Sequence, residues 1–139
     1  MNFSIRTYNS GQMITGFHFF ILSRGQNSGK PGRDPWCNCF VFESDDENLA
    51  DRFYWLCYAC WYCGKFRQYL VGSVIDLIRI SDLKQVLELA DSATHHLGEK
   101  FYEALDMMHQ IEAHSVKTIE RLKHMQRMKV EILRALVAV

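Results

Sequence analysis

The distribution of apolar residues changes once along this chain. Up to about residue 80, apolar residues form short clusters separated by Gly, Pro, Asn and Asp, whereas residues 82–139 contain one glycine, Gly98, and no proline. Short clusters between turn-forming residues are typical of strands and short helices, and a long stretch without such residues is typical of helix. We therefore predict an α+β protein with a small mixed α/β head over residues 1–81 and long helices over residues 82–139.

Within the head, three apolar stretches predict strands. Met13–Leu22 and Cys39–Glu43 are rich in aromatic and β-branched residues, and Val71–Ile80 has the composition of a short buried strand. Between the first two, residues 23–35 carry three glycines, two prolines and several polar residues, so this segment predicts a loop.

The aromatic segment over about residues 47–63 predicts a helix. Acidic residues at Asp45, Asp46 and Glu47 suit its first turn, and Gly64 suits its C-terminal cap. Aromatic residues fill much of this segment. Core packing explains them, whereas stacking on nucleic-acid bases would require that the rings be exposed.

The tail predicts two helices. One covers about residues 83–96, with Ser81 or Asp82 as its N-cap, and a second follows the break at Gly98 and ends near residue 137. Apolar or small residues recur every three or four positions along the second helix, with one shift in phase, as in a coiled coil with a stutter. The residues that we expect to mediate self-association are Phe101, Met108, Ile111, Ile119, Leu122 and Met125.

Charge along the tail is divided into two zones. Seven acidic residues lie between Asp82 and Glu112 with two lysines, and six basic residues lie between Lys117 and Arg134 with two glutamates. A helix of roughly 40 residues is about 60 Å long and cannot bury an apolar stripe on a small head. We therefore expect a homodimer through the tail, and antiparallel pairing would set acidic against basic zones. The alternative is a surface helix with solvated charged faces.

Overall charge limits how the protein could bind nucleic acid. The chain has 139 residues, of which 48% are hydrophobic and 23% charged, and sixteen basic residues balance sixteen acidic ones. This composition supports a folded core and excludes a polybasic binder. Any contact with DNA must therefore come from a local patch.

The loop over residues 23–35 is the candidate for such a patch. Its Gly25–Pro31 segment differs from a phosphate-binding P-loop, because only three residues separate Gly25 from the Gly29-Lys30 pair and Pro31 stands where Ser or Thr is needed. Its basic, amide and hydroxyl side chains nevertheless suit phosphates and base edges. The candidate DNA contacts here are Arg24, Gln26, Asn27, Ser28, Lys30 and Arg33. A solvated turn is the alternative interpretation.

Cysteine and histidine spacing gives little support for catalysis or metal binding. The five cysteines are an odd number, and Cys57, Cys60 and Cys63 lie in an aromatic helix rather than in the turns that hold structural zinc. We interpret the cysteines as reduced and mainly buried, although Cys37, Cys39, Cys57 and Cys60 would form a metal site if they converged. No spacing indicates a catalytic set, so we expect neither an enzyme nor a cofactor, and no catalytic or metal-binding residue is assigned.

Several short motifs occur in the order seen in a known family. Residues 21–30 (ILSRGQNSGK), 39–43, the aromatic helix and 66–83 (FRQYLVGSVIDLIRISDL) together resemble the C-terminal half of a target recognition domain in the specificity subunits of type I restriction–modification systems. The matching positions are Ser23, Arg24, Gly25, Gly29, Lys30, Tyr54, Leu56, Tyr69, Gly72, Ser73, Ile75, Ile80, Asp82 and Leu83. The loop also looks like that of a small family of uncharacterised bacterial proteins.

This resemblance implies a non-catalytic module that touches DNA, weakly or with the help of a partner. Lys65 and Arg67 would join the loop as DNA contacts. The N-terminal apolar stretch is about half of the roughly 20 residues that a membrane span requires, and no basic segment precedes it. We therefore expect a soluble, cytoplasmic protein that does not engage a membrane. The alternative function is a protein-interaction adaptor in which the tail is the binding surface and the loop has no role.

Overall fold

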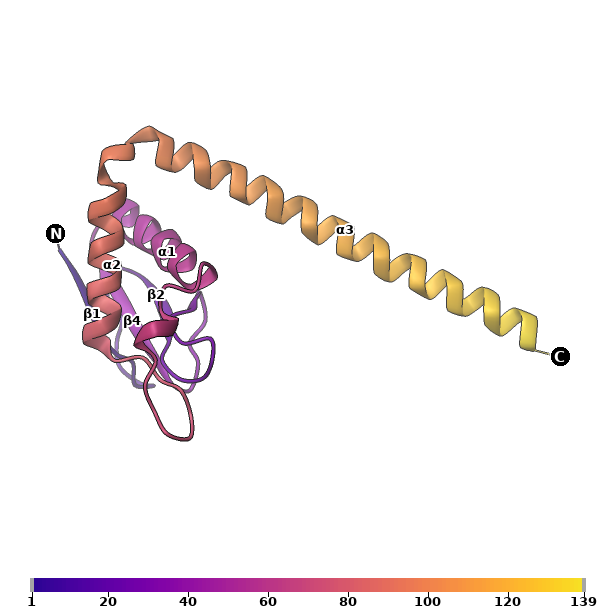
Figure 1. Cartoon of the computed structure of the whole chain (residues 1–139), viewed down its shortest axis with the longest axis horizontal. Coiled ribbons are helices and arrows are strands. Elements are labelled where there is room, and N and C mark those ends of the chain that lie inside the picture. Colours follow the sequence, from indigo (N-terminus) through magenta and orange to yellow (C-terminus); the bar gives the residue numbers. More distant parts are fainter. Residues whose placement is uncertain (1, 139) are drawn as a thin grey trace. The chain divides into compact units, whose positions relative to one another are not determined.

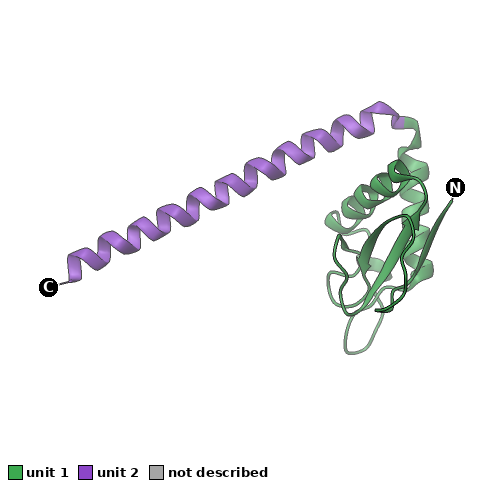
Figure 2. Cartoon of the chain, turned by 180° about the vertical axis from the view of Figure 1, so that it is seen from behind, with its two compact units in different colours: residues 1–96 green, residues 97–139 purple. Residues whose placement is uncertain are grey.

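The computed structural model describes residues 2–138 and divides into two compact units, residues 1–96 and 97–139 (Figure 2). The first unit contains an antiparallel sheet and two α-helices, and the second is a single long helix. This arrangement confirms the predicted α+β class. The division that the sequence suggests near Ser81 lies at the start of the second helix, which packs within the first unit.

The sheet contains β1 (Phe3–Thr7), β2 (Phe17–Leu22), β3 (Pro31–Gly32) and β4 (Cys39–Ser44) (Figure 1). Among the described residues its strand order is β1-β4-β2-β3, and every pair of neighbours is antiparallel. Strand β4 is therefore central and pairs with both β1 and β2. The predicted strands Met13–Leu22 and Cys39–Glu43 correspond to β2 and β4.

Helix α1 (Glu47–Tyr62) follows β4 directly. The Asp46 carboxylate accepts hydrogen bonds from the backbone N–H groups of Asn48 and Leu49, at 2.9 and 3.4 Å, which satisfies two donors of the first turn. The helix ends at Tyr62, and Gly64 adopts a φ of +74° just beyond it. The predicted helix and its N-cap are thus confirmed, whereas its C-cap residue is Cys63 rather than Gly64.

Alternation along the strands divides the sheet into two faces. Phe19 and Phe42 lie opposite each other on β2 and β4 and face α1, where their rings stack at 4.8 Å and the ring of Phe53 lies 5.2 Å from that of Phe42. Phe20 and Val41 point to the other face and pack with a smaller apolar group. The period of two expected for a strand therefore places the main core between the sheet and the helices.

Helix α2 (Ile80–Thr94) covers the same side of the sheet as α1. The Arg52 side chain of α1 donates to the Asp91 carboxylate at 2.8 Å and to the Thr94 hydroxyl at 2.9 Å. Arg52 and Asp91 side chains are only 15% and 10% exposed. This polar contact joins the two helices at the edge of the core.

The prediction of a buried strand over Val71–Ile80 is wrong. Val71 and Leu77 exchange two backbone hydrogen bonds, so the segment folds back on itself, and Val74 at its tip is 93% exposed. The turn depends on Gly72, whose φ is +126° and whose added Cβ would lie 2.2 Å from the Ile75 carbonyl oxygen. A local turn therefore outweighs the strand propensity of the apolar residues.

Element boundaries differ from the prediction at three further places. Strand β1 was not predicted, because its partner β4 is distant in sequence and its own pattern is short. Strand β2 begins at Phe17 rather than Met13, just after Gly16 with its φ of +83°. Helix α2 begins at Ile80, and its N-cap residue is Arg79 rather than Ser81 or Asp82.

The second unit consists mainly of α3 (Glu99–Val137), a helix of 39 residues. A short 3₁₀ turn over residues 95–97 and Gly98, with a φ of +53°, precede it. The predicted break at Gly98 and the predicted end near residue 137 are therefore confirmed. Within residues 2–138, no helix is both long and apolar enough to span a bilayer.

Candidate functional site

The loop that carries most of the predicted DNA contacts is a tightly bonded turn between β2 and β3. The Gly29 N–H donates to the Leu22 carbonyl at 2.7 Å, and the Leu22 N–H donates to the Lys30 carbonyl at 2.9 Å. Ser28 is buried, and its hydroxyl donates to the Gly25 carbonyl at 2.7 Å. Ser28 therefore shapes the loop and does not face solvent, whereas Gln26 and Asn27 are exposed at its tip.

Helix α1 holds this loop in place from the core side. The Cys57 thiol donates to the Gly29 carbonyl at 3.1 Å, and both groups are buried. A Cβ added to Gly29 would lie 2.2 Å from the ring of Phe66, which is itself 2% exposed. Only glycine fits this close approach, so the position of the loop is set by the core of the unit.

Two basic side chains near the loop lie over aromatic rings of α1. The Lys30 ammonium is 5.1 Å from the centroid of the Trp61 ring, and the Arg33 guanidinium carbon is 3.8 Å from the centroid of the Tyr54 ring. Both distances are within the range of cation–π interactions. A cation over a ring keeps its N–H groups available at the edge, so both side chains can still donate to an anion.

These rings belong to a continuous row along α1, which we call the aromatic face: Tyr54, Trp55, Tyr58, Trp61 and Tyr62. Neighbouring ring centroids along the row are 4.9 to 6.1 Å apart. Tyr62 is 71% exposed, and the other four rings are half-buried. By contrast, Phe53 of the same helix is fully buried. Tyr54 and Trp61 also pack against the core cluster, so core packing explains part of this face as well as the inner side of the helix.

A small crevice lies where the loop meets the end of α1. Its volume is about 70 Å³, and it is lined by Gln26, Asn27, Ser28, Trp61, Gly64, Phe66, Arg67 and Leu70. Loop amides, an indole ring and a guanidinium therefore border one opening. We call the aromatic face together with Lys30, Arg33, Arg67, Gln26 and Asn27 the basic–aromatic surface.

The segments that form this surface differ in charge from the rest of the chain. Residues 17–33 and 53–75 contain five Lys or Arg residues and no Asp or Glu, although the whole chain has a net charge of zero. Lys65 and Arg67 in the second segment are exposed. The local positive charge that DNA binding would require is thus present in a protein that is neutral overall.

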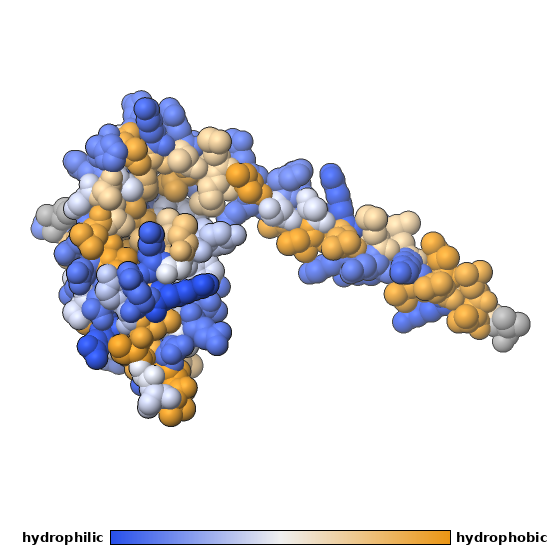
Figure 3. Space-filling model, in the orientation of Figure 1, coloured by the Kyte–Doolittle hydropathy of each residue, from blue (hydrophilic) through white to orange (hydrophobic). Residues whose placement is uncertain are grey.

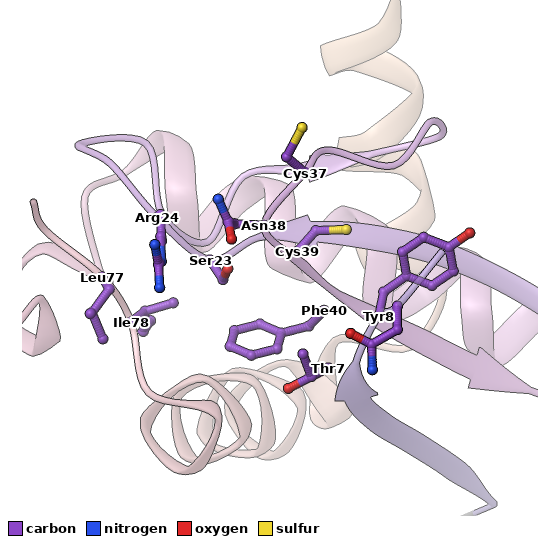
Figure 4. Close-up of a pocket in the computed structure, with 11 residues that line it drawn as sticks. Thr7, Tyr8, Ser23, Arg24, Cys37, Asn38, Cys39, Phe40, Leu77 and Ile78 are labelled. Atoms are coloured by element: carbon purple, nitrogen blue, oxygen red, sulfur yellow. The ribbon is translucent and has the colours of Figure 1, made fainter. Parts of the chain in front are cut away.

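Arg24 borders a different cavity from the other predicted contacts. Its side chain faces an opening of about 290 Å³ between the ends of β1, β2 and β4 and the residues just before α2 (Figure 4). The residues that line this cavity are Thr7, Tyr8, Asn9, Ser23, Arg24, Cys37, Asn38, Cys39, Phe40, Leu77 and Ile78. Arg24 therefore does not border the crevice that Gln26, Asn27 and Arg67 share.

All five cysteines are free thiols. Cys37 and Cys63 are exposed, and Cys39, Cys57 and Cys60 are buried. Burial raises the pKa of the Cys60 thiol to about 11 and also raises the pKa values of Cys39 and Cys57. Neutral thiols are poor metal ligands and poor nucleophiles. Within the described part of the chain, no group of three or more His, Cys, Asp or Glu residues is arranged to hold a metal ion.

The residues predicted for self-association lie along α3, and most are exposed. Exposed fractions are 65% for Ile111, 53% for Ile119, 54% for Leu122 and 63% for Met125. Met108 is half-buried and Phe101 is buried. Apolar residues follow one another along the helix surface (Figure 3). A large apolar area on a helix is typical of a protein-binding surface.

Sequence reasoning did not identify the aromatic partners of Lys30 and Arg33. The available signal was the spacing of the rings in α1, because Tyr54, Tyr58 and Trp61 recur at steps of four and three. Phe53, Cys57 and Cys60 repeat at the same steps one residue earlier and form the buried side. The two rows are adjacent on the helix, so the second row is only half-buried, and Tyr54 and Trp61 lie at the edge of the core.

Comparisons with known proteins give one match. No curated protein and no solved structure matches the chain. None of the comparisons links it to restriction–modification specificity subunits, so that resemblance remains a prediction. Residues 5–135 match a family described as a family of unknown function, DUF6943. Because the match covers most of the chain, the protein belongs to the DUF6943 family.

Proposed function

We propose that this protein is a non-catalytic DNA-interaction module whose basic–aromatic surface contacts the nucleic acid. The observation that carries the proposal is the position of Lys30 and Arg33 over rings of the aromatic face, in segments that hold five basic residues and no acidic one. The resemblance to target recognition domains supports the same function.

Each part of the surface matches one type of nucleic-acid contact. Lys30, Arg33 and Arg67 can donate to phosphate oxygens, and Gln26 and Asn27 can donate to and accept from base edges. Lys30 and Arg33 already lie over the rings of Trp61 and Tyr54, and the exposed ring of Tyr62 offers a flat surface on which an unpaired base can stack. Held by the Cys57–Gly29 contact, the loop needs little ordering when it binds, which lowers the entropic cost.

The small number of basic residues predicts weak, salt-dependent binding. Three phosphate contacts would give a slope of about −2.7 in log K against log salt concentration for duplex DNA. Raising the salt from 50 to 200 mM would then weaken binding about 40-fold. Lys65 and Arg24 would steepen this slope if they also reached phosphates.

Fluorescence anisotropy with labelled 30-base-pair duplex and with the matching single strand tests the proposal. We expect binding at 50 mM salt that falls steeply at 200 mM, and a loss of at least ten-fold in the Lys30→Gln/Arg67→Gln variant. The matched control is Arg79→Gln/Lys84→Gln, which removes the same charge from the N-cap and the N-terminal part of α2. Absence of binding at low salt, or equal loss in both variants, would rule out this surface as the DNA site.

Self-association through α3 is the second part of the proposal. Its support is the row of exposed apolar residues between Ile111 and Met125. A protein-interaction adaptor that uses α3 and binds no DNA is the competing function. Five free thiols fit a reducing compartment, so we propose a cytoplasmic location.

A further inference from the structure

Helix α3 carries an apolar stripe along one side. At roughly 100° per residue, Ile111, Ile119, Leu122 and Leu133 lie within about 60° of Met108 around the helix axis. Ile111, Ile119, Leu122 and Leu133 are 50 to 65% exposed. The stripe from Met108 to Leu133 is about 38 Å long. A second helix of similar length could pack along the whole of this stripe.

Charges on α3 are divided between its two halves. Residues 99–116 contain four acidic residues and one lysine, for a net charge of −3, and residues 117–137 contain six basic and two acidic residues, for a net charge of +4. The dividing point lies within two residues of the midpoint of the helix, which is residue 118. The two halves are therefore similar in length and opposite in sign.

The stability of a single helix does not explain this division. A helix dipole favours acidic residues in the first turn and basic residues in the last turn, whereas Asp106, Glu112 and Lys117 lie in the interior. Several residues four positions apart have the same sign, as in Lys117 with Arg121 and Lys123 with Arg127, although Arg127 and Glu131 are opposite. Such like-charged pairs repel within one helix. The pattern therefore indicates an external partner.

We infer that α3 pairs antiparallel with α3 of a second copy of the chain, acidic half against basic half. This inference rests on the proposed self-association and specifies its orientation. With full overlap about a two-fold axis at residue 118, Glu103, Asp106 and Glu112 fall within one residue of the levels of Arg134, Lys129 and Lys123. Parallel pairing would instead set like charges side by side along the whole length.

Charge reversal of the full-length protein tests the orientation, with oligomeric state measured by analytical ultracentrifugation. One variant carries Glu103→Lys, Asp106→Lys and Glu112→Lys, a second carries Lys123→Glu, Lys129→Glu and Arg134→Glu, and a third carries all six changes. We expect a wild-type dimer, a dissociation constant raised at least ten-fold in each three-residue variant, and recovery in the six-residue variant. Circular dichroism checks the helix content of each variant.

The outcomes separate the inference from the proposal on which it rests. A monomeric wild-type protein would overturn self-association itself and would leave the adaptor function. A wild-type dimer whose affinity is the same in all charge variants would overturn only the antiparallel arrangement, because parallel pairing keeps like charges together in every variant.

Disulfide trapping gives a second measurement that does not depend on charge. The exposed thiols are first removed by Cys37→Ser and Cys63→Ser. Positions 111 and 125 of the two chains lie at the same level only in the antiparallel dimer. Mixing an Ile111→Cys variant with a Met125→Cys variant should give a cross-linked pair of the two chains in preference to pairs of like chains. Preferential cross-linking of like chains would contradict the inference.

Discussion

Replacing Gly29 by alanine should damage the fold and the basic–aromatic surface together. Gly29 has a φ of +98°, and its added Cβ would lie 2.2 Å from a ring carbon of Phe66. The unusual backbone conformation costs about 1–3 kcal/mol for alanine. Displacing the ring of Phe66, which is 2% exposed, adds about 1–3 kcal/mol. We expect a total loss of about 2–6 kcal/mol in the free energy of unfolding.

Gly25→Ala is the matched control within the same loop. Gly25 has a similar φ of +93°, but its added Cβ would meet no atom within 4 Å. The free energy of unfolding of this variant should therefore fall only by the cost of the unusual backbone conformation, about 1–3 kcal/mol. Urea unfolding of the full-length chain, followed by circular dichroism, measures both losses. Equal losses in Gly25→Ala and Gly29→Ala would refute the argument that the Phe66 ring fixes the position of the loop.

Three further predictions concern the first unit. Asp91→Ala should lower the free energy of unfolding by about 2–3 kcal/mol, because it removes the carboxylate that pairs with the mostly buried Arg52 guanidinium. In urea unfolding, the double variant Arg52→Ala/Asp91→Ala should lose less unfolding free energy than the two single variants added together. Asp46→Ala removes the N-cap of α1, so in the same assay its free energy of unfolding should be about 1 kcal/mol lower. Burial raises the pKa of Cys60 from 9.0 to about 11, so the folded protein keeps a proton that the unfolded chain releases. The free energy of unfolding should therefore fall between pH 9 and 11 by up to about 2–3 kcal/mol, and urea titrations at pH 8 and 10.5 should show a smaller fall in Cys60→Ala.

Local signals in the sequence predicted the regular helices and the central strands. Asp46 and Gly64 mark both ends of α1, and Gly98 marks the start of α3, because caps and breaks act within a few residues. Val71–Ile80 was misjudged because its apolar composition is that of a strand. The turn at Gly72 is instead closed by the hydrogen bonds between Val71 and Leu77, which the apolar composition does not indicate.

The candidate site was predicted only in part, because its geometry depends on contacts between distant segments. Loop composition identified Lys30 and Arg33 as candidates, but their rings on α1 are more than 20 positions away. Composition could not distinguish Ser28, which is buried, from the exposed Asn27 beside it. It also grouped Arg24 with the other basic residues, although Arg24 lines a separate cavity.

The most direct test of the proposed DNA surface uses the three tryptophans as internal probes. Trp55 and Trp61 belong to the aromatic face, whereas Trp36 packs on the opposite side of the sheet with Phe20 and Val41. The side-chain indole N–H signals of the three residues can be followed by NMR while a short single-stranded oligonucleotide is added at low salt. Our account predicts that the signals of Trp55 and Trp61 shift and that of Trp36 stays in place. A shift confined to Trp36, or no shift at saturating oligonucleotide, would contradict it.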